Sequence, residues 1–252
     1  MQTPAQDIDY VESLELPDEP AGARLESTPV EFGSAQEVAT VGAQLAEFSE
    51  AVPAAQRAVV ADCLLLAQLA ADKATAMNDD LQAWYDQYLK VLKALGWLQT
   101  SMDFKATEVS DDNAGVHQAI LPVLTAMLGP VAASASMVVA VLKGLQEMNK
   151  DDPWITLFDR SSSHARGAKF QLGFVDADPT GDTVKVQLMA LAIDAQRRVT
   201  QVLFFKLAQE SAKLAVAQGE LSVGAERLNG IRQAVADKVA PFVVDNIGKI
   251  DI

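Results

Sequence analysis

Residues 113–142 read NAGVHQAILPVLTAMLGPVAASASMVVAVL, a run of thirty positions without a formal charge. The chain around this run has 252 residues, of which 34 are acidic, and a formal net charge of −14. A segment that faces solvent normally carries charged side chains. The run therefore predicts a core element, a membrane-active element or a surface that a partner covers.

The uncharged run is long enough to span a bilayer, which takes about 20 apolar residues in a helix. Pro122 and Gly129-Pro130 interrupt it, however. Proline lacks the N–H group that a helix needs and clashes with the preceding turn, so a Gly-Pro step ends one helix and starts another. The pieces at 112–128 and 130–148 predict a helical hairpin rather than a fixed transmembrane helix, with a helix start at Ser110.

Two interpretations of this hairpin remain open. In the first, it is apolar on all sides because it lies at the centre of the fold. In the second, it leaves the core and enters a bilayer or meets a partner. The apolar side chains that would make this contact are Ile120, Leu121, Leu124, Met127, Leu128, Met137, Val138, Val141 and Leu142.

Upstream of the hairpin, the sequence predicts helices. Ser34-Ala-Gln-Glu37 matches a capping box, in which a hydroxyl and a carboxylate satisfy the first N–H groups of a helix, here running to about Val52. Residues 54–95 contain no Gly or Pro, and apolar residues recur there every three or four positions. We expect one long helix, ending at Gly96 with Trp97 folded back on Leu92. The alternative is a break at residues 78–80.

Strand signals appear mainly in the C-terminal half. Apolar residues alternate with polar or small ones over 169–174 and again over 184–192. Asp178-Pro-Thr-Gly181 between them is a turn sequence, so the two segments predict a β-hairpin. Residues 102–106 could form a short strand, and residues 199–207 fit a third strand or a helix start. A final helix is expected from Ser222.

The N-terminal 33 residues form an acidic arm. Residues 1–34 hold eight acidic side chains and one basic one, a net charge of −7 and half of the total. Four prolines and interleaved acids are typical of disorder, but the apolar residues could dock onto this chain or a neighbour. The candidate docking residues are Ile8, Tyr10, Val11, Leu14 and Leu16.

These observations predict a mostly α fold of the α+β class. Long helices would pack around the central apolar hairpin, with a small antiparallel sheet in the C-terminal half. The expected organisation is an arm at 1–33 and a single helical domain at 34–252, with the β-hairpin inserted at about 168–207.

The sequence carries no signature of catalysis, nucleotide binding or a metal site. His117 and His164 are the only histidines, too few for a typical zinc site. We therefore expect no enzyme, no cofactor and no metal. Cys63, the single cysteine, lies in an apolar run and is expected to be an inert core thiol. The alternative for Cys63 is acylation or a reactive thiol.

Two functions follow as hypotheses. The first is a non-enzymatic protein that acts on membranes or lipids, toxin-like or effector-like, with the hairpin as its active element. The second is an assembly subunit whose arm docks onto a neighbouring protomer, which would imply self-association or a protein partner. A dense basic patch is missing, so nucleic acid is not expected as a partner. The N-terminus lacks a basic and apolar leader, which predicts cytoplasmic synthesis without a cleaved signal, with export by a non-classical route left open.

Overall fold

The computed structural model describes residues 4–19, 30–76, 80–100, 102, 104–107, 115–164, 166–195, 197–207 and 212–250. Within these ranges the helices are α1 (Pro4–Ser13), α2 (Ala54–Ala74), α3 (Leu81–Ala94), α4 (Val116–Leu128), α5 (Pro130–Ala135), α6 (Met137–Gly144), η1 (Leu145–Glu147), α7 (Pro153–Ser162), η2 (Val202–Phe204), α8 (Ala225–Val239) and α9 (Val243–Asn246). The strands are β1 (Glu37–Val41), β2 (Gln44–Phe48), β3 (Leu98–Gln99), β4 (Lys105–Thr107), β5 (Ser163–His164), β6 (Gly167–Ala177), β7 (Thr183–Asp194), β8 (Lys213–Gly224) and β9 (Ile247–Ile250).

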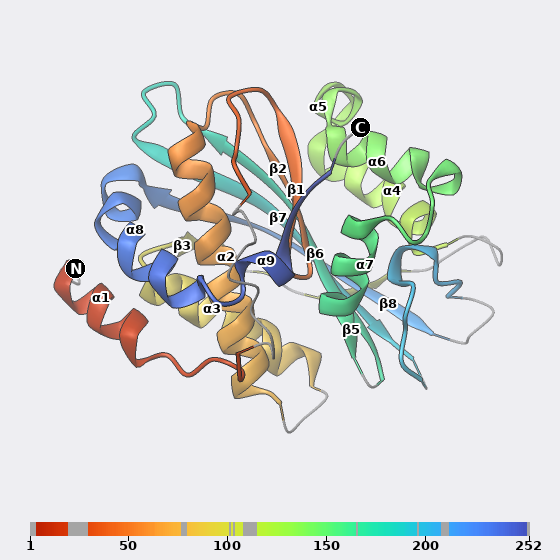
Figure 1. Cartoon of the computed structure of the whole chain (residues 1–252). Coiled ribbons are helices and arrows are strands. Elements are labelled where there is room, and N and C mark those ends of the chain that lie inside the picture. The colour runs from red at the N-terminus through yellow and green to blue at the C-terminus, as the bar shows by residue number, and fades with distance from the viewer. Residues whose placement is uncertain are drawn as a thin grey trace.

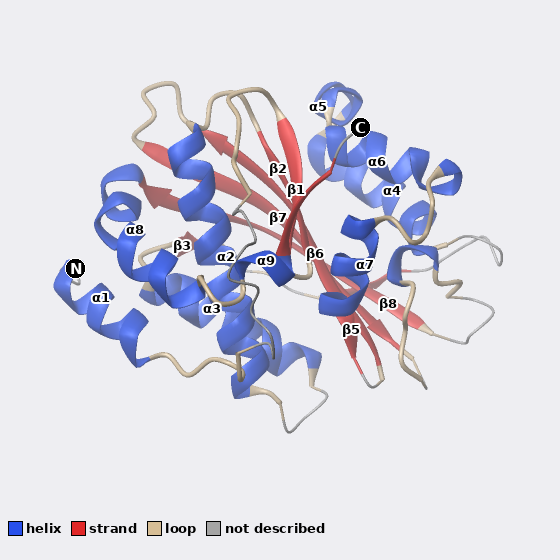
Figure 2. Ribbon diagram, viewed as in Figure 1, coloured by secondary structure: helices blue, strands red, loops and turns tan. Residues whose placement is uncertain are grey.

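A single mixed sheet organises the described part of the chain. Its nine strands run in the order β3-β8-β7-β6-β2-β1-β9, with β4 also paired to β8 and β5 to β6. Helices α2, α3 and α8 lie on one side of the sheet, and α4 to α7 lie on the other (Figures 1 and 2). The prediction of a mostly helical fold with a small hairpin is therefore wrong: the architecture is a mixed α/β sandwich of three layers.

The predicted hairpin is confirmed but has a larger role. Strands β6 and β7 pair antiparallel from Gly167↔Asp194 to Ala177↔Val184. Strand β8 pairs with β7 over its whole length, and β2 pairs parallel to β6. Helices cover both faces at the centre of this sheet, so apolar residues of one strand alternate between two cores instead of between core and solvent. In β8, Leu214 and Val216 belong to one core and Ala217, Leu221 and Val223 to the other, so the alternation changes phase along the strand.

The helix expected from Ser34 to Val52 is wrong, because this segment is the β1–β2 hairpin. The two strands are buried on both faces, so their apolar residues lack the period of two that identifies a half-exposed strand. Gly42 adopts a φ of +56° at the tight turn. A two-residue hairpin turn requires such a positive φ, which glycine adopts readily.

The single long helix expected over 54–95 is also wrong. It is two helices, α2 and α3, which pack side by side. The Asp80 carboxylate caps α3 by accepting hydrogen bonds from the N–H groups of Gln82 and Ala83. Of the predicted break, residues 78–79 lie outside the described residues, as does Met77 of the apolar stripe. The predicted ending is confirmed: Gly96 has a φ of +94°, and Trp97 N–H donates to Leu92 O at 3.0 Å.

The remaining boundaries shift by smaller amounts. Ser222 lies in β8, and the last long helix starts after Gly224. Residues 202–204 form a short 3-10 helix, neither the strand nor the α-helix considered for 199–207. The short strand predicted at 102–106 appears as β4. Ser110, the expected helix start, lies outside the described residues.

Candidate functional site

The uncharged run folds into the outer layer formed by α4, α5 and α6, and the expectation that it lies at the centre of the molecule is wrong. Gly129, with a φ of +78°, ends α4, and Pro130 begins α5, as the sequence predicted. Pro122 lies inside α4 without ending it. Ser136 separates α5 from α6 and caps α6 through a hydrogen bond from Val139 N–H. We call α4, α5 and α6 together the outer helical layer.

The structure divides the predicted hairpin residues into two groups. One group is fully buried against the sheet: Ile120, Leu124, Val138, Val141 and Leu142. The other group is partly buried and packs against the same core: Leu121, Met127, Leu128 and Met137. The layer therefore presents one apolar face to the sheet.

The opposite face of the layer is open to solvent and uncharged over residues 116–142, and Lys143 in the last turn of α6 is the exposed charge that follows. Val131 is 84% exposed, the highest value among the large apolar side chains that the structure describes as exposed. The other exposed residues of this face are Pro122, Thr125, Ala126, Pro130, Ala132, Ser134, Ala135 and Ala140. Solvent thus meets small, apolar or uncharged polar side chains along residues 116–142 of the layer.

One buried carboxylate anchors the layer to the sheet. Glu47 on β2 is 7% exposed, and its Oε2 accepts hydrogen bonds from Ser136 Oγ (2.7 Å) and Val138 N–H (2.9 Å). Its Oε1 accepts from Gln36 Nε2 at 2.6 Å. A carboxylate at this position satisfies N–H groups at the start of α6 and complements the positive end of the helix.

A second anchor lies at the start of α4. Val116 N–H donates to Phe205 O, and His117 Nδ1 lies 2.6 Å from Leu203 O. The 3-10 helix η2 that supplies Leu203 is held by Asp159 of α7, which accepts from Val202 N–H at 2.8 Å. Burial raises the pKa of Asp159 to about 6, although this hydrogen bond acts in the opposite direction. His117 is thus a buried packing residue.

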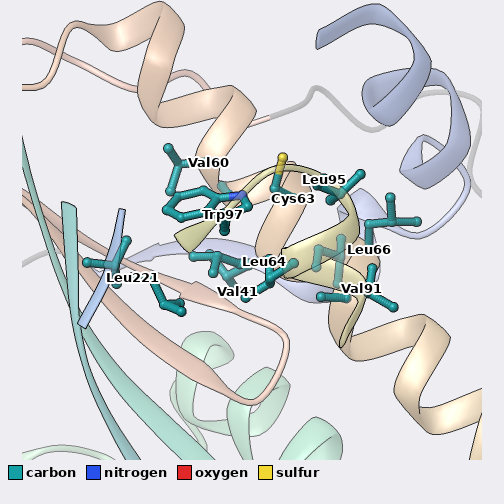
Figure 3. Packing of buried hydrophobic residues seen from close by; sticks show 14 of the residues in the cluster. Val41, Val60, Cys63, Leu64, Leu66, Val91, Leu95, Trp97 and Leu221 are labelled. Atoms are coloured by element: carbon teal, nitrogen blue, oxygen red, sulfur yellow. The ribbon is translucent and has the colours of Figure 1, made fainter. Parts of the chain in front are cut away.

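Cys63 lies on the buried side of α2, with none of its surface exposed. Figure 3 shows its sulfur among Val60, Leu95 and Trp97. Burial and the nearby Asp62 carboxylate raise the pKa of the thiol, which therefore stays protonated. Acylation or thiol chemistry would need α2 to move away from its neighbours.

The predicted docking residues of the arm pack against the core of this same chain. Val11 is fully buried, and Tyr10, Leu14 and Leu16 pack partly buried against the same core, while Ile8 is half-buried. Helix α1 lies along α8 (Figure 1), and Asp7 pairs with Arg227 at 2.7 Å. The apolar side of the arm is thus covered by its own protomer.

Sequence analysis missed a polar cluster around Lys169. This lysine on β6 is 1% exposed, and its Nζ lies 2.9 Å from Asp72 Oδ1, 4.5 Å from the Trp84 ring centroid, and against His164 Nε2. Burial lowers its pKa, while Asp72 acts in the opposite direction. A lysine in an alternating strand normally faces solvent, and nothing local in the sequence shows that α2 and α3 cover this face.

A metal centre and a membrane-spanning helix are two further features to consider within the described residues. No group of three or more His, Cys, Asp or Glu side chains within the described ranges could hold a metal ion. One described helix, α2, is long and apolar enough to cross a membrane, but 72% of its most apolar window is buried in the fold. Core helices share this property, so α2 carries no argument about membranes.

Comparisons with known proteins give only distant structural likenesses. No protein-family model and no curated protein matches the sequence. The structure is similar to a delta-endotoxin with 14% identity and a TM-score of 0.37, over 79% of this chain and 87% of that chain. It is similar to activated monomeric Cyt2Ba from Bacillus thuringiensis subsp. israelensis with 15% identity and a TM-score of 0.28, over 56% and 78%. It is similar to the Evf virulence factor with 12% identity and a TM-score of 0.29, over 98% of this chain and 92% of that chain. These likenesses to toxins and a virulence factor are too weak to carry a functional argument.

Proposed function

We propose that this protein acts on membranes or lipids in a toxin-like or effector-like, non-enzymatic role, with the outer helical layer as the element that meets the bilayer. The observation that carries the proposal is the solvent-exposed face of this layer, which bears no formal charge from residue 116 to 142 in a chain of net charge −14. A charged side chain at the centre of a bilayer costs about 3 kcal/mol on insertion scales. This segment has no such cost.

The position of the layer supports the same role. Its buried residues belong to the core on one side of the sheet, whereas α2, α3 and α8 form a separate core on the other side. The layer could therefore leave the sheet without exposing the second core. Its inner face would then add Ile120, Leu124 and Val138 to the surface that contacts lipid.

A charge placed on the exposed face tests the proposal. We expect the wild-type protein to release dye from phospholipid vesicles, and we expect Val131→Glu to reduce release about tenfold or more, because a carboxylate resists transfer into lipid. Leu98→Glu is the matched control: Leu98 is 73% exposed and belongs to β3, at the far edge of the sheet. Equal loss in both variants, or no vesicle binding by the wild type at neutral or acidic pH, would refute the proposal.

A further inference from the structure

A cavity of about 410 Å³ lies on the side of the molecule opposite the outer helical layer. Helices α2, α8 and α9 and the segment before β1 form its walls, which are largely apolar and include Val30, Phe32, Val243 and Ile247. Two carboxylates, Asp62 of α2 and Asp237 of α8, also line it. Small-molecule sites typically combine such a volume and apolar lining with a few polar groups.

Asp62 is partly buried and differs from the acidic groups that the fold buries more deeply. Asp7 pairs with Arg227, Glu47 accepts three hydrogen bonds and Asp159 accepts one from a backbone N–H. Among the described residues, no hydrogen-bond donor or ion-pair partner reaches Asp62. A partly buried carboxylate without a hydrogen-bonding partner is unfavourable, so a cationic group placed in the cavity would stabilise Asp62.

The charges around Asp62 limit the class of ligand that the cavity can bind. Asp237 lines the same cavity and accepts a hydrogen bond from Gln233 Nε2 at 2.8 Å. Arg232, on α8, is the cation that acts on Asp62, and it does so from outside the cavity lining. Two carboxylates repel an anion. Apart from these two carboxylates, the side chains that line the cavity are apolar and provide no further oxygen ligand for a metal ion.

We propose that this cavity binds an alkylammonium group on a small apolar body, with the Asp62 carboxylate as its counter-ion. The aliphatic walls and the Phe32 ring receive the apolar part, and a substituted ammonium tolerates such walls because it is weakly hydrated. The group could belong to a free amphiphilic amine or to the choline headgroup of a lipid. The site is independent of the function proposed for the outer helical layer.

Titration calorimetry with hexyltrimethylammonium tests the proposal, with hexanol as the neutral comparison. We expect saturable binding of the ammonium compound at about pH 8 and binding about tenfold weaker or more in Asp62→Asn, because the carboxylate supplies the counter-charge. Asp86→Asn, which removes an exposed acid on α3, is the control and should bind as the wild type does. Equal affinity for hexanol, or unchanged affinity in Asp62→Asn, would overturn the proposal.

The pH dependence provides a second measurement. Burial raises the pKa of Asp62 to about 6, with Arg232 acting in the opposite direction. Below that pH the carboxylate is protonated, so affinity should fall about tenfold per pH unit. Asp62→Asn should have no such dependence. A wild-type affinity that is flat between about pH 8 and 5 would contradict the assignment of Asp62 as the counter-ion.

A variant that fills the cavity tests the location of the site without changing Asp62. Ala58 lines the cavity one helical turn before Asp62, so Ala58→Leu should occupy its volume. We expect this variant to lose the ammonium compound while circular dichroism shows a retained fold; a folded Ala58→Leu that still binds would overturn the location. Binding to vesicles of phosphatidylcholine and of phosphatidylglycerol distinguishes the two possible ligands, a lipid headgroup and a free amine. An Asp62-dependent preference for phosphatidylcholine identifies a lipid headgroup, and its absence identifies a free amine.

Discussion

At the residue scale, a few buried polar groups hold the layers together. Arg57 of α2 is fully buried, and its guanidinium donates to the backbone oxygens of Val52 and Ser49 and to the Glu37 carboxylate at 2.6 Å. Glu47 and Asp159 likewise accept backbone hydrogen bonds that hold the outer helical layer and its neighbour η2 in place. Each is a charge with partners from distant parts of the chain, so its role depends on the fold and cannot be seen in its neighbours in sequence.

Asp159 gives a prediction for stability against pH. Its folded-state pKa of about 6 lies above the value of about 3.9 for an unfolded chain. The folded state therefore holds a proton that the unfolded state releases, and the stability contributed by this group falls as pH rises from about 4 to about 6. Asparagine cannot ionise and keeps an oxygen that accepts from Val202 N–H. We expect Asp159→Asn to be more stable than the wild type by up to about 2 kcal/mol at about pH 7.5.

Urea unfolding at about pH 7.5 and about pH 4 checks this prediction, because the advantage of Asp159→Asn should disappear at the lower pH. Asp151→Asn, which changes an exposed acid before α7, serves as the control and should have little effect at either pH. A gain that is the same at both pH values would show that ionisation of Asp159 is not its cause.

At the element scale, the outer helical layer is a set of short helices that depend on their neighbours. Helices α5 and α6 have six and eight residues, too short to be stable alone. Packing on the sheet and the hydrogen bonds to Glu47 stabilise these short helices. The sequence located the Gly129-Pro130 break, because that signal is local. It did not show the break at Ser136, where a serine and a distant carboxylate act together.

Removing the Glu47 carboxylate should loosen this layer selectively. In Glu47→Ala, Ser136 Oγ and Val138 N–H lose their acceptor in a buried place, at a cost of about 2–3 kcal/mol. We expect faster hydrogen exchange of amides in 136–142 than in α2, measured by mass spectrometry. Ser134→Ala, which removes only an exposed hydroxyl that donates to Val131 O, is the control. Uniformly faster exchange in both cores would mean that the carboxylate supports the whole fold instead.

At the scale of the whole molecule, net charge opposes the proposed function on anionic membranes. A chain of net charge −14 is repelled by anionic lipid at neutral pH. Salt screens this repulsion, since the Debye length falls to about 3 Å at 1 M ionic strength. We expect co-sedimentation with phosphatidylglycerol vesicles to increase with added salt and with acid. Binding to phosphatidylcholine should be insensitive to salt, and a decrease with salt on either lipid would indicate a basic contact surface instead.

The local features of this protein follow from short stretches of its sequence. The 178–181 turn with its flanking strands, the Gly96 helix ending, the Gly129-Pro130 break and the uncharged character of 113–142 all depend on residues close together in the chain. Proline and glycine geometry and charge are properties that a neighbouring segment does not change.

The sheet, and the side of each element that faces it, depend on contacts between segments that are far apart in the chain. Strands β1 and β2 are buried on both faces, so burial removed the alternation by which a strand is recognised. In β8 the buried residues change from one core to the other along the strand, which interrupts the alternation. The same covering buried Lys169 beneath α2 and α3 and placed the apolar run in an outer layer instead of at the centre. Burial on a second face depends on which distant helix packs there, and no short stretch of sequence contains that information.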